Sequence, residues 1–189
     1  TRFVLKIIVD HGLAAEQMDV KQAFLLSKLP TDARIFIYPP PGFPRKVPQG
    51  KLLRLLKCLY GLKQSGREWN KNVHNFITAL QGHNFVRSTA DPCLYIDTTV
   101  FPISIILVFV DDFIAAGQQN RLDDIVNKFD RKYPIKRLGK LFWYLKCHIL
   151  RSVRFGWLHF NQEMFAREIL RIAGMADCKP VPTPAIDLM

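Results

Sequence analysis

The sequence has no long hydrophobic run and no leader-like start. Its longest nearly unbroken apolar stretch covers residues 103–110, whereas a membrane-spanning helix needs roughly 20 such residues. The first residues lack the charged, apolar and small-residue regions of a signal peptide, and the chain begins at Thr1 without an initiator Met. We therefore expect no membrane association, and we expect the segment to come from a longer chain.

Cysteines are few, and none of them belongs to a C-x-x-C pair. This spacing argues against a zinc site made of cysteines alone and against the disulfide framework of a small secreted domain. Because most of the cysteines lie in apolar stretches, we expect buried free thiols. They are Cys58, Cys93, Cys147 and Cys178.

Acidic residues are scarce beside basic ones, since 16 Asp and Glu face 27 Lys and Arg and leave a net charge of +11. A surplus of this size favours a polyanionic partner, with nucleic acid ahead of an anionic membrane surface. The alternative is that the charge serves only solubility. The basic residues form clusters that suggest patches along one path: Arg45, Lys46, Lys51, Arg54 and Lys57; Lys63, Arg67 and Lys71; Arg131, Lys132, Lys136, Arg137 and Lys140.

The composition, with 49% apolar and 23% charged residues, is that of a globular protein. Hydrophobic spacing predicts both helices and strands. The helices are predicted over residues 2–15, 67–80, 120–132 and 163–173, the single strands over 16–20, 35–38 and 93–96, and the hairpins over 103–116 and over 142–151 with 156–160. This mixture favours an α+β domain over a doubly wound parallel sheet.

Two adjacent carboxylates, Asp111 and Asp112, stand between two apolar runs. A plain hairpin turn would explain them, because Asp is common in turns. However, no Gly accompanies them, and no Lys or Arg lies within several residues to balance their charge. Carboxylates beside a buried sheet face need cations, and hard divalent cations take oxygen ligands. Asp19, at the end of the strand predicted over 16–20, would be a third carboxylate of the kind that two-metal phosphoryl transfer needs.

Motifs along nearly the whole chain resemble, in order and at similar spacings, the reverse transcriptases of copia-type retrotransposons. The motifs are Asp-Val-Lys-Gln-Ala-Phe at 19–24, Pro-Pro-Gly-Phe at 40–43, Leu-Tyr-Gly-Leu-Lys-Gln-Ser at 59–65, Asp-Pro-Cys-Leu-Tyr at 91–95 and Val-Asp-Asp-Phe at 110–113. The resemblance implies a polymerase palm, with a ferredoxin-like antiparallel sheet backed by helices and partial fingers, over residues 1–176. A proline-containing exit segment would follow over 177–189. The implied activity is that of an RNA-directed DNA polymerase, which adds deoxynucleotides to a primer 3′-hydroxyl.

The resemblance also assigns roles to single residues. Asp19, Asp111 and Asp112 would be the catalytic carboxylates and would bind two Mg²⁺ ions, or Mn²⁺ in their place. Phe24 would lie beneath the sugar of the incoming nucleotide and exclude a 2′-hydroxyl, although a core position would also explain it. The other assignments are Gly61, Lys63 and Gln64 for nucleotide binding, Tyr144, Leu145 and Lys146 for gripping the primer, and Lys136 for donating a proton to pyrophosphate.

The implied partners are an RNA or DNA template with its primer, deoxynucleotide triphosphates, and the rest of a Pol polyprotein with its integrase and RNase H. The implied location is the cytoplasm or a virus-like particle. The sequence departs from the family at Lys146, where Gly is usual, at Gly66, where Pro is usual, and at Ala33 and Arg34, where acidic residues are usual.

Two alternatives stay open, and the departures at Lys146 and Gly66 leave room for the first of them. The first is a catalytically inactive, nucleic-acid-binding relic of such a polyprotein, and inactivity of the 189 residues on their own also stays open. The second is a metal nuclease on another fold, which would use the same carboxylates. The nuclease does not explain Phe24 or the motif over residues 59–65.

Overall fold

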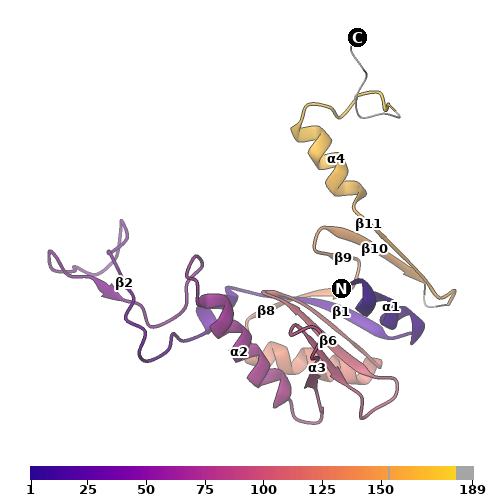
Figure 1. The fold of residues 1–189 in the computed structure, drawn as a ribbon, viewed down its shortest axis with the longest axis horizontal. Helices are drawn as coiled ribbons and strands as arrows, with labels where there is room; N and C mark the ends of the chain where they lie inside the picture. Colours follow the sequence, from indigo (N-terminus) through magenta and orange to yellow (C-terminus); the bar gives the residue numbers. More distant parts are fainter. Residues whose placement is uncertain (153, 182–189) are drawn as a thin grey trace. The chain divides into compact units, whose positions relative to one another are not determined.

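The structure, a computed structural model, describes residues 1–152 and 154–181. It confirms a mixed α/β chain with antiparallel sheets. The chain forms two compact units, Thr1–Leu141 and Phe142–Met189 (Figure 1). Most of the exit segment predicted over 177–189 lies outside the described residues, so its boundary stays a prediction.

The first unit is built on a six-stranded sheet in the order β4-β5-β6-β7-β1-β8, in which all neighbours are antiparallel. The strands are β1 (Ala14–Val20), β4 (Val86–Arg87), β5 (Leu94–Asp97), β6 (Ser104–Phe109), β7 (Asp112–Gly117) and β8 (Ile135–Lys140). β6 and β7 form the hairpin predicted over residues 103–116. Because β1 pairs with β7, the strand that carries Asp19 lies beside this hairpin.

Two helices cover one face of the sheet. α2 (Ser65–Thr78) and α3 (Gln119–Lys132) each turn an apolar stripe towards the strands, as their spacing predicted (Figure 1). The strand residues in the shared core include Met18, Val20, Ile106, Val108, Phe113 and Ala115. Because side chains alternate between the faces of a strand, Asp19 and Asp112 project from the opposite face.

The predicted helix over residues 2–15 is too long. α1 spans Arg2–Asp10, and β1 begins at Ala14 rather than at residue 16. The helix ends in a tight turn, where Gly12 takes a φ of +59° and the Leu13 N–H donates to the Ile8 carbonyl at 2.9 Å. Leu13 is buried like the inner face of the helix, so its apolar character gave no sign of this turn.

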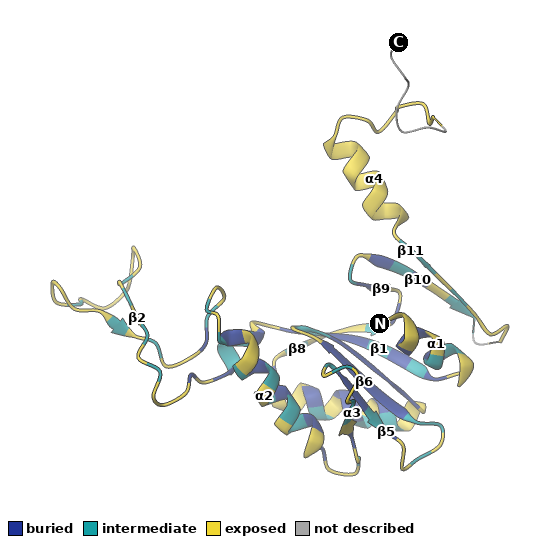
Figure 2. Ribbon diagram, viewed as in Figure 1, coloured by how far each residue is buried: buried dark blue, intermediate teal, exposed yellow. Residues whose placement is uncertain are grey.

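The segment after β1 contains little regular structure. A short 3₁₀ helix, η1 (Ala23–Leu26), is followed by β2 (Phe36–Ile37) and β3 (Leu53–Arg54), which pair with each other. β2 is shorter than the strand predicted over 35–38, and the sequence did not predict β3. Figure 2 shows that this part of the chain is mostly exposed, in contrast to the buried strands of the six-stranded sheet.

The second unit contains a three-stranded sheet in the order β11-β10-β9 and the helix α4 (Glu163–Ile172). Its strands are β9 (Trp143–Tyr144), β10 (Cys147–Ser152) and β11 (Trp157–Asn161). The hairpin predicted from residues 142–151 and 156–160 is present as β10 and β11. Its first arm is shorter than predicted, because the chain reverses at Leu145 and Lys146. No residue of α4 is buried (Figure 2).

The reversal places Lys146 at a φ of +63°, a conformation that costs a residue with a Cβ more than it costs glycine. This is the position at which the family usually has Gly. We expect Lys146→Gly to be more stable than Lys146→Ala by up to about 1 kcal/mol. Both variants lose the Lys146 ammonium, which lies 5.0 Å from the centroid of the Phe165 ring, so the pair isolates the backbone effect. Equal midpoints in urea unfolding would contradict this prediction.

A buried carboxylate joins the edge of the sheet to α3. Burial by itself would raise the pKa of Asp97, but hydrogen bonds from Asn84 and Thr99 and the charge of Arg121, which lies 2.6 Å away, outweigh it and lower the pKa. A lowered folded-state pKa means that this stabilisation is present above the ordinary Asp pKa of 3.8 and is lost as the pH falls through the folded value.

We expect Asp97→Asn to destabilise the chain by about 3–5 kcal/mol at neutral pH, because Arg121 loses its buried partner. The variant should also lose less stability than the wild type between pH 5 and pH 3. Asp123→Asn, at an exposed acid on α3, is the control and should shift neither quantity. Melting temperatures measured across this pH range test the prediction, and parallel curves for wild type and Asp97→Asn would contradict it.

The prediction of buried thiols is only half right. All four cysteines are free, and Cys58 and Cys147 are buried, but Cys93 is partly exposed and Cys178 is exposed. Cys178 follows α4 within residues 173–181, which form neither strand nor helix and are all exposed. Within the described residues, no helix is long and apolar enough to cross a membrane.

Candidate active site

The three predicted carboxylates meet where β1 joins the β6–β7 hairpin. Asp19 of β1 pairs with Asp112, the first residue of β7, so the two side chains project side by side from one face. Asp111 lies in the two-residue turn between β6 and β7. Its carbonyl accepts a hydrogen bond of 2.8 Å from the Val20 N–H, which ties the turn to β1.

The electrostatics of this group show uncompensated negative charge. The pKa of Asp112 is raised, first by burial and then by the charges of Asp111 and Asp19, while a hydrogen bond from Gln17 acts in the opposite direction. None of the three carboxylates takes part in a salt bridge with a described residue. Partly buried like charges of this kind are stabilised by cations.

We tested this group against the divalent ions that the sequence predicted. In residues 1–152 and 154–181, no three His, Cys, Asp or Glu side chains are arranged to hold a metal ion by themselves. Mg²⁺, however, is usually bound by one or two carboxylates together with substrate phosphates and water. Asp19 and Asp112 supply such a pair on one face, with Asp111 in the adjoining turn. The donor set therefore fits an ion whose remaining ligands come from a phosphate-bearing substrate and water.

Lys136 stands next to this group. It lies in β8 and pairs with Asp19, so Asp112, Asp19 and Lys136 form a row across three neighbouring strands. Its side chain is exposed, and it forms no salt bridge within the described part of the chain. This row places Lys136 on the strand next to the one that carries Asp19. The role of Lys136 as a proton donor stays a prediction.

Phe24 lies against the segment over residues 59–65. The ring centroids of Phe24 and Tyr60 are 4.7 Å apart, and Phe24 also packs on the core below α2 and α3. Burial raises the pKa of Tyr60, and the charges of Asp111 and Asp19 raise it further. Tyr60 thus contacts the Phe24 ring and responds to the charges of Asp19 and Asp111. The sequence analysis did not predict a role for Tyr60. Its position directly before Gly61, in the motif over residues 59–65, could have indicated one.

The segment over residues 59–65 is a turn that leads into α2. Gly61 has a φ of +93°, and no atom lies within 4 Å of where a Cβ would be, so the backbone there is open to a ligand. The Ser65 hydroxyl is buried and donates to the Leu59 carbonyl at 2.6 Å, which closes the turn. Lys63 is exposed and Gln64, directly before α2, is half-buried. Their nucleotide contacts stay predictions.

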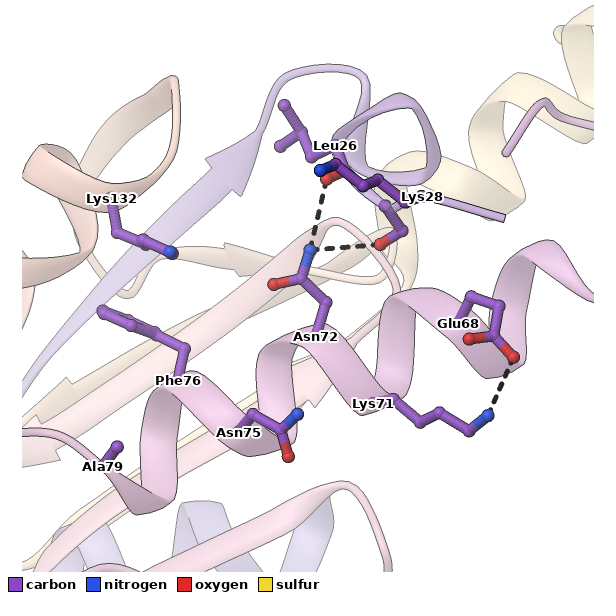
Figure 3. A pocket seen from close by; sticks show the side chains of 10 residues that line it. Leu26, Lys28, Glu68, Lys71, Asn72, Asn75, Phe76, Ala79 and Lys132 are labelled. Atoms are coloured by element: carbon purple, nitrogen blue, oxygen red, sulfur yellow. Dashed lines mark hydrogen bonds and ion pairs between the residues drawn. The ribbon is translucent and has the colours of Figure 1, made fainter. Parts of the chain in front are cut away.

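Asn72 anchors the segment that carries Phe24 (Figure 3). Its Nδ2 donates to the Leu26 carbonyl at 3.3 Å and to the Ser27 hydroxyl at 3.2 Å, and its Oδ1 accepts from the Tyr133 hydroxyl at 3.0 Å. A cavity of about 650 Å³ lies beside these bonds, and no predicted site residue lines it. The contribution of this region to the site is thus to hold η1 in place.

The residues predicted to grip the primer belong to the second unit. Tyr144 ends β9 and is buried, while Leu145 and Lys146 form the reversal before β10, with φ values of +50° and +63°. This turn joins β9 to β10, which pair with each other. Its function at a primer end stays a prediction.

Comparison with known proteins shows which family and which relatives the chain resembles. A family model described as reverse transcriptase (RNA-dependent DNA polymerase) matches residues 1–187. The retrovirus-related Pol polyprotein from transposon RE1 of Arabidopsis thaliana is 32% identical over 184 residues, which cover 97% of this chain and 12% of that protein. The corresponding polyprotein from transposon TNT 1-94 of Nicotiana tabacum is 29% identical over 185 residues, covering 97% and 14%. No solved structure matches the chain.

The chain belongs to the reverse transcriptase family, and its relatives are Pol polyproteins of copia-type retrotransposons. The family predicted from the motifs is thereby confirmed. The chain spans between 12% and 14% of the length of the two plant relatives.

Proposed function

We propose that this chain is the palm, with part of the fingers, of a copia-type reverse transcriptase. In this role it adds deoxynucleotides to a primer 3′-hydroxyl under the direction of an RNA or DNA template and releases pyrophosphate. The observation that carries the proposal is the pairing of Asp19 with Asp112 across β1 and β7, with Asp111 in the adjoining turn and the pKa of Asp112 raised. Membership of the family supports it.

The three carboxylates would hold two Mg²⁺ ions, or Mn²⁺ as a substitute. When bound, such ions stabilise the charge that develops during phosphoryl transfer. The protein contributes mainly by fixing positions. Phe24 and Tyr60 form the wall against which the sugar rests, and Lys136 stands where a proton donor to pyrophosphate is needed.

The template and primer are proposed to follow the basic clusters. Residues of the three clusters, including Arg45, Lys46, Lys63 and Lys136, are exposed and so can contact phosphates. The remaining partners in this proposal are deoxynucleotide triphosphates and the other parts of a Pol polyprotein, namely its integrase and RNase H. The proposed location is the cytoplasm or a virus-like particle.

Primer extension tests the proposed reaction. A protein that contains these 189 residues with flanking Pol sequence is given an RNA template, a DNA primer and Mg²⁺. We expect addition of the deoxynucleotide that is complementary to the next template base, and loss of addition when the metal is chelated. Four templates that differ only in that base provide the control for template direction. Failure to add any nucleotide would overturn the proposal.

Salt dependence tests the nucleic-acid track. We expect the logarithm of the binding constant to fall with the logarithm of salt concentration, with a slope of several units, about 0.9 for each phosphate neutralised. Charge reversal at Arg45 and Lys46 should reduce this slope by about two. Lys6→Glu, on α1 and outside the clusters, should leave the slope unchanged. A flat response of the wild type would favour the solubility explanation.

A nucleic-acid-binding relic without catalysis is the second candidate. Lys146 favours it, because this residue occupies a left-handed position at which the family has Gly. The same two experiments separate the candidates. A relic would bind primer and template with the steep salt dependence and would add no nucleotide.

A further inference from the structure

The turn that carries Asp111 is strained and is held from two sides. Val110 takes a φ of +56°, which β-branched residues rarely adopt. The Val110 carbonyl accepts a hydrogen bond of 2.6 Å from Nε1 of Trp69. The next carbonyl, that of Asp111, accepts the bond of 2.8 Å from the Val20 N–H. Strained conformations persist where their surroundings fix them, and here α2 and β1 each contribute one bond.

Trp69 is itself buried and closely packed. Its side chain lies on α2 and is 2% exposed, and its ring meets Phe113 and Tyr133 edge to face, with centroids 6.5 Å and 5.4 Å away. A buried indole N–H needs an acceptor, and the Val110 carbonyl is that acceptor. Ser65, at the start of the same helix, closes the turn over residues 59–65. One helix thus supports both the nucleotide segment and the turn of Asp111.

We propose that Trp69 is a positioning residue for catalysis. Its indole N–H fixes the Val110 carbonyl, and this bond sets the direction in which the Asp111 carboxylate points. The inference rests on the proposed function, because it gives the direction of Asp111 a consequence for metal binding and for the rate of nucleotide addition. Trp69 does not touch the substrate and acts only through the turn.

Trp69→Phe tests the inference, because it keeps a ring in the core and removes the donor. Tyr95→Phe is the matched control, since it removes a buried hydroxyl that contacts His74 on the same helix at 3.3 Å and does not bond to the turn. We expect Trp69→Phe to lower kcat by about tenfold, to change the KM for the nucleotide by less than about twofold and to raise the Mg²⁺ requirement severalfold. Tyr95→Phe should leave all three quantities within about twofold of the wild type.

Val110→Gly provides a second variant. Glycine takes a positive φ without strain. A turn with Gly at this position therefore depends less on the hydrogen bonds from Trp69 and Val20 that hold it. We expect the loss of kcat caused by Trp69→Phe to shrink to less than about threefold in the Val110→Gly background. Equal losses in both backgrounds would show that Trp69 acts only through general stability, and would overturn the inference.

Two readouts do not depend on activity. Hydrogen exchange of the peptide over residues 107–113 should quicken by about tenfold in Trp69→Phe and stay unchanged in Tyr95→Phe. Affinity for Mn²⁺ alone, followed by the signal of the free ion, should weaken in Trp69→Phe only. If the wild type adds no nucleotide, the proposed function fails while these two measurements still decide the role of Trp69. Unchanged exchange would overturn the inference, and so would faster exchange with unchanged Mn²⁺ affinity.

Discussion

Asp111→Asn is expected to lower the rate of nucleotide addition by at least about 10²–10³, the range typical of losing one electrostatic contact to the transition state. The amide keeps the shape of the carboxylate but has no negative charge, so it binds a divalent cation poorly. Asp111 stands in the turn beside the Asp19–Asp112 pair, and it forms no salt bridge with any residue of 1–152 or 154–181. Single-turnover primer extension with saturating Mg²⁺ measures the effect.

The folding of Asp111→Asn should be intact. Without metal, its free energy of unfolding should equal or exceed that of the wild type, because one of the charges that raise the pKa of Asp112 is gone. Urea unfolding in the presence of a chelator measures this quantity, with the exposed Asp123→Asn as the matched control. A folded Asp111→Asn that extends primers at nearly the wild-type rate would show that Asp111 is not a metal-binding catalytic residue.

Phe24→Val is expected to admit ribonucleotides. The argument is steric, because a ring beneath the sugar penalises the 2′-hydroxyl of the ribonucleotide and leaves the deoxynucleotide unaffected. The ring of Phe24 is held in place by Tyr60, 4.7 Å away, and through η1 by Asn72. Single-nucleotide incorporation of the deoxy and ribo forms gives the ratio of their efficiencies, which should fall strongly in Phe24→Val and stay unchanged in Phe24→Tyr.

Phe24 also packs on the core, so loss of its ring should cost stability, up to about 3 kcal/mol for a large-to-small change. Melting temperatures therefore accompany the incorporation assay. Tyr60→Phe keeps the ring contact and loses only the hydroxyl, so it should retain the selectivity of the wild type. A folded Phe24→Val with the wild-type ratio of efficiencies would make Phe24 a core residue only.

Local sequence patterns predicted α2, α3 and the central strands of the first unit, but they did not predict β3, β4 or β8. α2 and α3 were placed to within two residues because their apolar side chains recur at the helical period and are backed by the sheet. The β6–β7 hairpin followed from its two apolar runs. The patterns failed where the backbone turns without a change in polarity, at Gly12 and at the reversal over Leu145 and Lys146. Left-handed backbone at Leu and Lys carries no sequence signal, since these residues rarely adopt it.

The sequence by itself determined the family and the candidate carboxylates, because motif order is a property of the linear chain. Only the tertiary structure decided which side chains meet. Periodicity gives the direction of a side chain but not its neighbouring strand or its register. The pairing of Asp19 with Asp112, the contact of Phe24 with Tyr60 and the bond from Trp69 to Val110 each join segments far apart in the sequence. Such contacts depend on how β1, α2 and the hairpin pack around one shared core.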